Sequence, residues 1–283
     1  MTIKADGVSR KIGPGPVRIK EVAVLRPFRR SRYDWLRPRF EVVILTALDH
    51  EFKAVRTHLR GPQTLRHPEG TLFETGRAGG SGRSIAVART GQGNTPTALI
   101  AERAIVMFRP RALLFVGVAG GLRSDVALGD VVVATKVYAF HGGKTESGQF
   151  LPRPQVWEAP HGLEQLAGYL AGIGEWTRRL TCEHHEPRVH LKPIAGGEVV
   201  VNCRSGETAE HLRRHFNDAV AVDMESVGVA CAGHLNASLP VLSIRGISDL
   251  ADGSKEVTDR AGWQVDAAAH AAAFALDLAT SMD

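Results

Sequence analysis

Short apolar runs rich in β-branched residues recur along the chain, and polar, Gly or Pro residues bound each of them. Runs of this kind are typical of strands that are buried on both faces of a sheet. We expect strands over Glu41–Ala47, Ser84–Thr90, Arg111–Val116, Asp130–Phe140, Leu191–Val201, Ala219–Val222 and Val241–Ile244.

Segments with apolar residues at helical spacing separate most of these runs. The expected helices are Leu48–Leu59, Ala98–Met107, His161–Leu170, Ser205–Phe216, Ser226–His234 and Arg260–Ala279. Strands that alternate with helices predict an α/β fold with a mostly parallel, helix-covered sheet. Two segments interrupt the alternation: residues 61–82 are interpreted as turn-rich with one short strand, and residues 141–188 as an excursion that closes over a ligand.

The composition is that of a globular protein with one large domain. Among the 283 residues, 43% are apolar and 23% are charged, which is ordinary for such proteins. Because no apolar run approaches the roughly 18 residues of a membrane span and the N-terminus lacks an apolar signal core, we expect a cytoplasmic protein without a membrane partner.

Cysteine and histidine residues do not indicate a disulfide framework or a metal site. Three cysteines at wide spacing form no such framework. Cys182 lies near His184, His185 and His190, but no pair among them has zinc-ligand spacing. We therefore expect a polar surface loop there and no metal.

Charge is distributed unevenly along the chain. Residues 1–40 contain eleven basic and three acidic side chains, a net charge of +8, whereas the whole chain carries +5. This asymmetry predicts a basic N-terminal extension (1–40) before a nearly neutral domain (41–283). The extension is interpreted either as a solvated, partly disordered arm or as a segment that meets an anionic ligand, an acidic protein or, less consistently with the rest of the chain, nucleic acid.

Two acidic segments follow expected strands near the C-terminus. Residues 222–226 read Val-Asp-Met-Glu-Ser, and residues 245–252 read Arg-Gly-Ile-Ser-Asp-Leu-Ala-Asp. Ligands of open α/β sheets bind beyond the carboxyl ends of the strands, so Glu225 and Asp249 are expected to converge on one site. The alternative places Glu225 in the first turn of a helix and makes Ser248 and Asp249 a helix cap.

A third carboxylate follows the first expected strand. Helical spacing puts Glu51 on the side of its helix that carries Leu48 and Val55, and we expect this side to face the end of the sheet. A buried carboxyl group near other carboxyl groups is suited to general acid or base catalysis. The alternative is a surface glutamate in the first turn.

Glycine-bearing turns follow three strands, at residues 91–93, 117–121 and 196–197. Glycine there allows the backbone to approach a ligand and exposes amide donors. The alternative, which each turn taken alone favours, is a tight connection without a role in binding. Pro96 stands where a dinucleotide fingerprint requires its third glycine, and Gly-Lys-Ser or Gly-Lys-Thr is absent. No nucleotide cofactor is therefore expected.

Taken in order, these segments resemble the nucleoside phosphorylase superfamily and, within it, 5′-methylthioadenosine/S-adenosylhomocysteine nucleosidases. The segments that carry the resemblance are Ala47–Glu51, Thr90–Gly93, Val116–Leu122, Gly129–Val133, Ala195–Glu198, Val222–Glu225 and Arg245–Asp252. The resemblance extends from about Glu41 to Ala279. It implies a single-domain, three-layer sandwich with a mixed, mostly parallel central sheet flanked by helices, no cofactor, and a homodimer.

The resemblance also implies roles for individual residues. Glu51 would activate the attacking water, and Asp249 would protonate purine N7 as the glycosidic bond breaks. Six further residues would bind or orient the substrate: Glu225 at the ribose hydroxyls, Met224 against the sugar, Ser248 beside the acid, the backbone around Val199 and Val200 at the base, and Gly120 in the site wall.

The expected function is therefore hydrolysis of the N-glycosidic bond of an adenine nucleoside. Phe115 and Val116 stand where phosphorylases of the superfamily place a phosphate-binding arginine, so water is favoured over phosphate. Val199 stands at the position of the aromatic ring that stacks on adenine in the nucleosidases, which leaves the base and the 5′ group open. The alternatives are a purine nucleotide (AMP or ATP) nucleosidase of bacterial defence, a phosphorylase, and a non-catalytic nucleoside sensor.

Overall fold

The computed structural model describes residues 40–79, 82–180 and 187–282. The expectations for the basic extension, and for Cys182, His184 and His185, lie outside the described residues. No helix in these ranges is long and apolar enough to cross a membrane.

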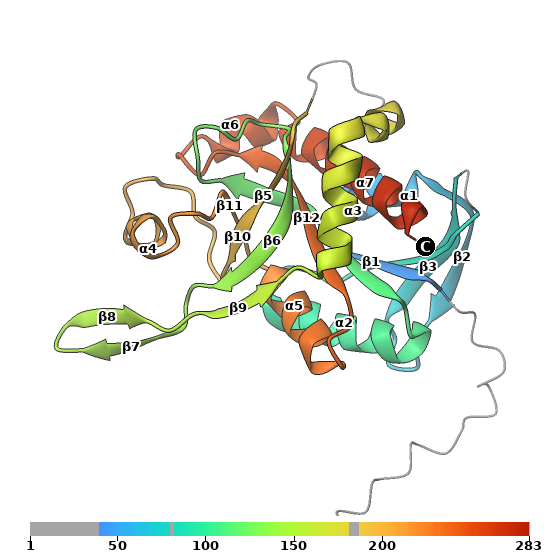
Figure 1. Ribbon diagram of the computed structural model, residues 1–283, viewed down its shortest axis with the longest axis horizontal. Coiled ribbons are helices and arrows are strands. Elements are labelled where there is room, and N and C mark those ends of the chain that lie inside the picture. Colours follow the sequence, from blue (N-terminus) through green and yellow to red (C-terminus); the bar gives the residue numbers. More distant parts are fainter. Residues whose placement is uncertain (1–39, 80–81, 181–186, 283) are drawn as a thin grey trace, which may run out of the picture. The chain divides into compact units, whose positions relative to one another are not determined.

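A mixed sheet forms the centre of the fold, with strand order β11-β10-β6-β12-β5-β1-β4-β3-β2 (Figure 1). Its strands are β1 (Val42–Thr46), β2 (Leu59–Arg66), β3 (Leu72–Ala78), β4 (Ser84–Arg89), β5 (Ala112–Gly121), β6 (Val131–Ala139), β10 (Val189–Gly196), β11 (Ala221–Asp223) and β12 (Val241–Asp249). The pairs among β4, β1, β5 and β12 are parallel, as are those among β6, β10 and β11. The antiparallel pair β12–β6 joins the two groups.

One end of the sheet closes on itself. The last residues of β5, Gly120 and Gly121, pair antiparallel with β11, which also pairs with β10. Strands β10, β6, β12, β5 and β11 consequently form a ring. This closure brings the carboxyl ends of β5, β11 and β12 together.

Helices cover both faces of the sheet in three layers, which confirms the predicted fold class. They are α1 (Asp49–Arg56), α2 (Asn94–Phe108), α3 (His161–Ile173), η1 (Glu175–Arg179), α4 (Glu207–His215), α5 (Ser226–Leu235), α6 (Lys255–Arg260) and α7 (Trp263–Ser281). Helices α1, α3 and α7 pack on one face and α2 and α5 on the other (Figure 1).

Successive side chains of the buried strands alternate between the two helix-covered faces of the sheet. In β1, Val42 and Ile44 belong to the core beneath α7, whereas Val43 and Leu45 belong to the core beneath α2. Successive strand residues point to opposite faces, so a strand covered on both sides must be apolar throughout. The continuous apolar runs therefore mark the strands that are buried on both faces.

Two irregular segments contain strands that the sequence interpretation missed. Residues 59–78 form the antiparallel pair β2–β3 and not a turn-rich loop. The excursion after β6 contains β7 (Gly143–Glu146), β8 (Gln149–Pro152) and β9 (Gln155–Glu158) before its predicted helix. Strand β9 returns to pair with β6, while β7 and β8 form a separate hairpin (Figure 1).

Candidate active site

A cavity of about 130 Å³ lies where the carboxyl ends of β1, β5, β11 and β12 meet. All eight residues that the sequence indicates as catalytic or substrate-binding line this cavity: Glu51, Gly120, Val199, Val200, Met224, Glu225, Ser248 and Asp249. The structure thus brings together side chains from segments that are far apart along the chain.

Glu51 is held at the junction of β1 and α1. The residue is 2% exposed. Oε2 accepts the backbone N–H groups of Ala47 (2.8 Å) and Leu48 (2.7 Å), and Oε1 accepts that of Val118 in β5 (2.8 Å). The surface-glutamate interpretation is therefore excluded, and the carboxylate is fixed between the first two strands of the site.

Glu225 precedes α5 and is 7% exposed. Its Oε1 accepts the N–H of Gly93 at 3.0 Å. Burial raises the pKa of Glu225 to about 7; the negative charges of Asp223 and Glu51 act in the same direction, and the cation of Arg245 acts against them. The group therefore changes its charge near neutral pH.

Arg245 is a fully buried cation in the middle of β12, and the sequence interpretation gave it no role. Its Nε and Nη2 both lie 2.7 Å from Oδ2 of Asp223, and Nη2 lies 3.9 Å from Glu225. The guanidinium also lies over the Phe115 ring, 4.0 Å from its centroid. A basic residue inside an apolar strand is the signal that indicates such a buried partner.

The remaining nitrogen of Arg245 and the carboxylate of Glu51 both lie next to Gly117. Nη1 is buried without a hydrogen-bond partner among the described residues. A Cβ atom built on Gly117 would collide with both this nitrogen and Oε1 of Glu51. Glycine at this position is what allows the cation and the carboxylate to approach each other.

Asp249 is the last residue of β12 and is 5% exposed. Oδ1 accepts the N–H of Ala251 at 3.0 Å, and Oδ2 lies 3.1 Å from Nζ of Lys255 and 3.4 Å from Oγ of Ser248. The interpretation of Ser248 and Asp249 as a helix cap was wrong, because Ser254 is the N-cap residue of α6.

Gly120 provides room for the Asp249 carboxylate. A Cβ atom at Gly120 would lie 2.9 Å from Oδ1 of Asp249, which is closer than side chains tolerate. Lys255, like Arg245, was missed by the sequence interpretation, although it also lines the cavity.

The segment after β10 forms one wall of the cavity. The predicted strand Leu191–Val201 ends earlier, at Gly196, so that Val199 and Val200 lie in a loop with half-exposed side chains. Asn94 anchors this loop through its Nδ2, which donates to the carbonyl of Gly197 at 2.6 Å. Freed from the sheet, the backbone of the loop is available to a ligand.

Asp252 does not line the cavity. Its carboxylate accepts the N–H of Ser254 at 3.0 Å and is exposed. In the described ranges, no group of three or more His, Cys, Asp or Glu side chains is placed to hold a metal ion. His190 instead lies 2.8 Å from Asp130.

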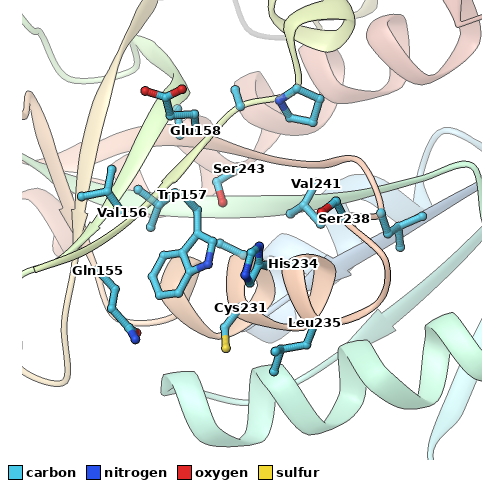
Figure 2. A pocket seen from close by; sticks show the side chains of 16 residues that line it. Gln155, Val156, Trp157, Glu158, Cys231, His234, Leu235, Ser238, Val241 and Ser243 are labelled. Carbon is cyan, nitrogen blue, oxygen red and sulfur yellow. The ribbon is translucent and has the colours of Figure 1, made fainter.

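A second, larger cavity of about 1030 Å³ lies between β9 and α5 and contains none of the predicted site residues (Figure 2). Its walls are mainly apolar, with Val156 and Trp157 from β9 and Leu235 from the end of α5. Glu158, its one carboxylate, lies 3.6 Å from Nζ of Lys136. The smaller cavity is lined by several buried carboxylates and is therefore the candidate active site.

Comparisons with known proteins concern the chain as a whole. The sequence profile of the Phosphorylase superfamily matches residues 41–280. The 5′-methylthioadenosine/S-adenosylhomocysteine nucleosidase of Maridesulfovibrio salexigens is 26% identical over 226 residues, which cover 78% of this chain and 91% of that protein. The ATP nucleosidase Cap17 of Escherichia coli is 28% identical over 200 residues, which cover 64% of this chain but only 39% of that protein.

The fold is also that of solved nucleosidases. The 5′-methylthioadenosine/S-adenosylhomocysteine nucleosidase from Neisseria meningitidis, crystallised with methylthio-immucillin-A, superposes with a TM-score of 0.71. The two sequences are 22% identical, and the superposition covers 85% of this chain and 99% of that one. This likeness concerns the arrangement of sheet and helices.

Proposed function

Because the chain belongs to the phosphorylase superfamily, we propose that it is a purine N-ribosyl hydrolase that releases free adenine from an adenine nucleoside. The observation that carries the proposal is the convergence of Glu51, Glu225 and Asp249 on one cavity. Hydrolysis of this bond needs a base for water, a group that stabilises a cationic sugar and an acid for the departing purine.

Glu51 is suited to activate water. The amides of Ala47, Leu48 and Val118 orient its carboxylate, while Nη1 of Arg245 lacks a partner among the described residues and lies nearby. A water molecule bound between them would be held by two groups of opposite charge. As its oxygen attacks C1′ of the ribose, Glu51 accepts the proton.

Glu225 and Asp249 act on the other two parts of the substrate. Glu225 accepts hydrogen bonds from the ribose hydroxyls and offsets the positive charge that develops on the sugar, and Met224 packs against it. Asp249, oriented by Ser248, donates a proton to N7 so that the purine leaves as a neutral base. The backbone at Val199 and Val200 contacts the base.

A chromatographic screen tests the function directly. Purified protein is incubated with methylthioadenosine, adenosylhomocysteine, adenosine, AMP and ATP, with and without phosphate. We expect adenine release without phosphate from at least one compound, and loss of that release in Asp249→Asn and Glu51→Gln. The matched control is Asp252→Asn, an exposed carboxylate outside the cavity. Cleavage only with phosphate would identify a phosphorylase. If wild type cleaves none of the five compounds, a nucleoside sensor would be favoured.

A nucleotide substrate is the second candidate, and the similarity to the ATP nucleosidase Cap17 favours it. The basic N-terminal extension carries the positive charge that would attract a phosphate tail. Charge reversal of Arg29, Arg30 and Arg32 is expected to raise KM for ATP and leave KM for adenosine unchanged. Equal KM values for ATP before and after the change would exclude the extension from the reaction.

Self-association is the remaining part of the proposal. We infer that the protein is cytoplasmic and forms a homodimer. Residues 41–283 would form the enzyme domain, and residues 1–40 would be an extension of it. The apolar cavity between β9 and α5, bordered by the exposed side chains of Val156 and Leu235 (Figure 2), supports this inference. Large exposed apolar patches are characteristic of interfaces.

A further inference from the structure

Lys255 is in direct contact with the group proposed as the acid. It is the first residue of α6, and its Nζ lies 3.1 Å from Oδ2 of Asp249. The lysine side chain is 26% exposed and lines the same cavity as Asp249. The Asp249 end of this ion pair is therefore buried in the site, whereas the Lys255 end is partly exposed to solvent.

The partners of Asp249 that the structure describes all donate hydrogen bonds to it. They are the Ala251 amide, Lys255 Nζ and the Ser248 hydroxyl. Ser248 donates at the longest of the three distances, 3.4 Å. A carboxylate in this setting is well placed to receive a proton, and the acid role requires that it then pass one to the purine.

The surroundings of Lys255 keep its ammonium group at this position. Asp259, one turn along α6, lies 3.6 Å from Nζ. Gln264 of α7 donates to the same Asp259 carboxylate at 2.8 Å. Glu256, the other acidic residue near the start of α6, lies 3.5 Å from Arg260 instead. Carboxylates from β12 and α6 thus hold the ammonium between them.

We propose that Lys255 supplies the proton that Asp249 transfers to purine N7, an inference that rests on the proposed function. As the C1′–N9 bond breaks, its electron pair moves into the purine. N7 takes the proton of Asp249, and Asp249 takes one from the Lys255 ammonium. The water oxygen bonds to C1′ and its proton passes to Glu51. Lys255 regains a proton from solvent and Glu51 releases one, so that substrate and water yield neutral purine and free sugar.

Lysine and arginine differ in the property that this role requires. An ammonium group can lose its proton, whereas a guanidinium remains charged in proteins. Lys255→Arg therefore retains the positive charge and removes the proton source, while Lys255→Met removes both. The two variants separate proton supply from electrostatic support.

The experiment measures kcat and KM from pH 5 to 9 for wild type, Lys255→Arg, Lys255→Met and the control Lys53→Met. Lys53 also forms a Lys–Asp ion pair, with Asp49, but on the exposed surface of α1. Two substrates are compared: the adenine nucleoside that wild type cleaves best, and 4-nitrophenyl riboside, whose leaving group departs without protonation. Circular dichroism establishes that each variant is folded.

We expect both Lys255 variants to lower kcat for the adenine nucleoside roughly 10-fold to 100-fold at pH 8, with KM nearly unchanged and the alkaline limb of the profile moved to lower pH. Cleavage of 4-nitrophenyl riboside stays within about twofold of wild type in both, and Lys53→Met resembles wild type.

Three results would overturn the inference or its premise. A wild-type pH profile in Lys255→Arg would show that charge alone suffices. Equal losses on both substrates would show that Lys255 supports the structure of the site and not the proton transfer. Failure of wild type to cleave either substrate would refute the proposed function itself. If Lys255→Met does not fold, Lys255→Arg decides between these outcomes.

Discussion

Glu51, Glu225 and Asp249 share one cavity, but each has a different kind of partner. Backbone amides hold Glu51, a buried arginine lies beside Glu225, and a partly exposed lysine contacts Asp249. The surroundings of a carboxyl group determine which of its protonation states is favoured. The same functional group, a carboxyl, is therefore suited to all three proposed roles, as base, sugar-binding group and acid, within one site.

The raised pKa of Glu225 predicts a pH-dependent stability. Burial favours its protonated form in the folded state, so the contribution to stability is complete below about pH 4.5 and is lost as pH rises through about 7. From pH 4.5 to 7.5, the free energy of unfolding of wild type should fall, relative to Glu225→Gln, by on the order of 1–3 kcal/mol. Urea unfolding measures this difference.

The control for that experiment is Glu210→Gln, which changes an exposed glutamate that pairs with Arg213 on α4. Its unfolding curves should follow those of wild type in this pH range. Parallel pH dependences for wild type and Glu225→Gln would show that Glu225 titrates alike in the folded and unfolded chains.

The close approach at Gly117 predicts a sensitive position. In Gly117→Ala the new methyl group would collide with Glu51 and Arg245, and displacement of catalytic groups by about 1 Å can lower activity roughly 100-fold. We expect this loss in kcat with the fold retained by circular dichroism. Gly172→Ala, in α3 with open space around its Cβ, should leave kcat unchanged; wild-type kcat in Gly117→Ala would contradict the proposed contact.

At the scale of elements, the site depends on where strands end. Strand β12 extends through Asp249, five residues beyond the predicted end at Ile244, because its carboxyl half still pairs with β5. The sequence interpretation missed strand β2 because seven of its eight residues are not buried. The strand therefore shows no apolar pattern. Apolar periodicity predicts buried strands but does not detect exposed ones.

Asp130 joins two elements away from the site and predicts a stability effect. It is buried and bonds to His190 at the start of β10 and to the amides of Ala127 and Arg188. Burial opposes ionisation, but these hydrogen bonds prevail and lower the pKa of Asp130. Its contribution is present above pH 3.8 and is lost as pH falls through the lowered value.

We expect Asp130→Ala to reduce the free energy of unfolding by roughly 2–4 kcal/mol at pH 7, as measured by urea titration, and by less as pH approaches 3. The exposed neighbour Asp125 provides the control, since Asp125→Ala should change stability by less than about 0.5 kcal/mol. Equal effects of the two substitutions would contradict a structural role for Asp130.

At the scale of the whole molecule, the large apolar cavity predicts an association surface. Leu235 is 75% exposed at its border. Burial of a charge in an interface is costly, so Leu235→Asp should convert a dimer to a monomer in light scattering at micromolar concentration. Leu72→Asp, at an exposed position of β3 outside the cavity, should remain dimeric; a Leu235→Asp dimer would place the interface elsewhere.

The sequence by itself determined the alternation of strands and helices, the inward side of Glu51 and the clustering of carboxylates at strand ends, because apolar spacing and strand direction are local properties. Only the tertiary structure decided which groups contact these carboxylates. Gly93 binds Glu225 across 132 positions of sequence, and the guanidinium of Arg245 reaches the site because β5 has a glycine opposite it. Such contacts depend on strand register and ring closure, which no local pattern specifies.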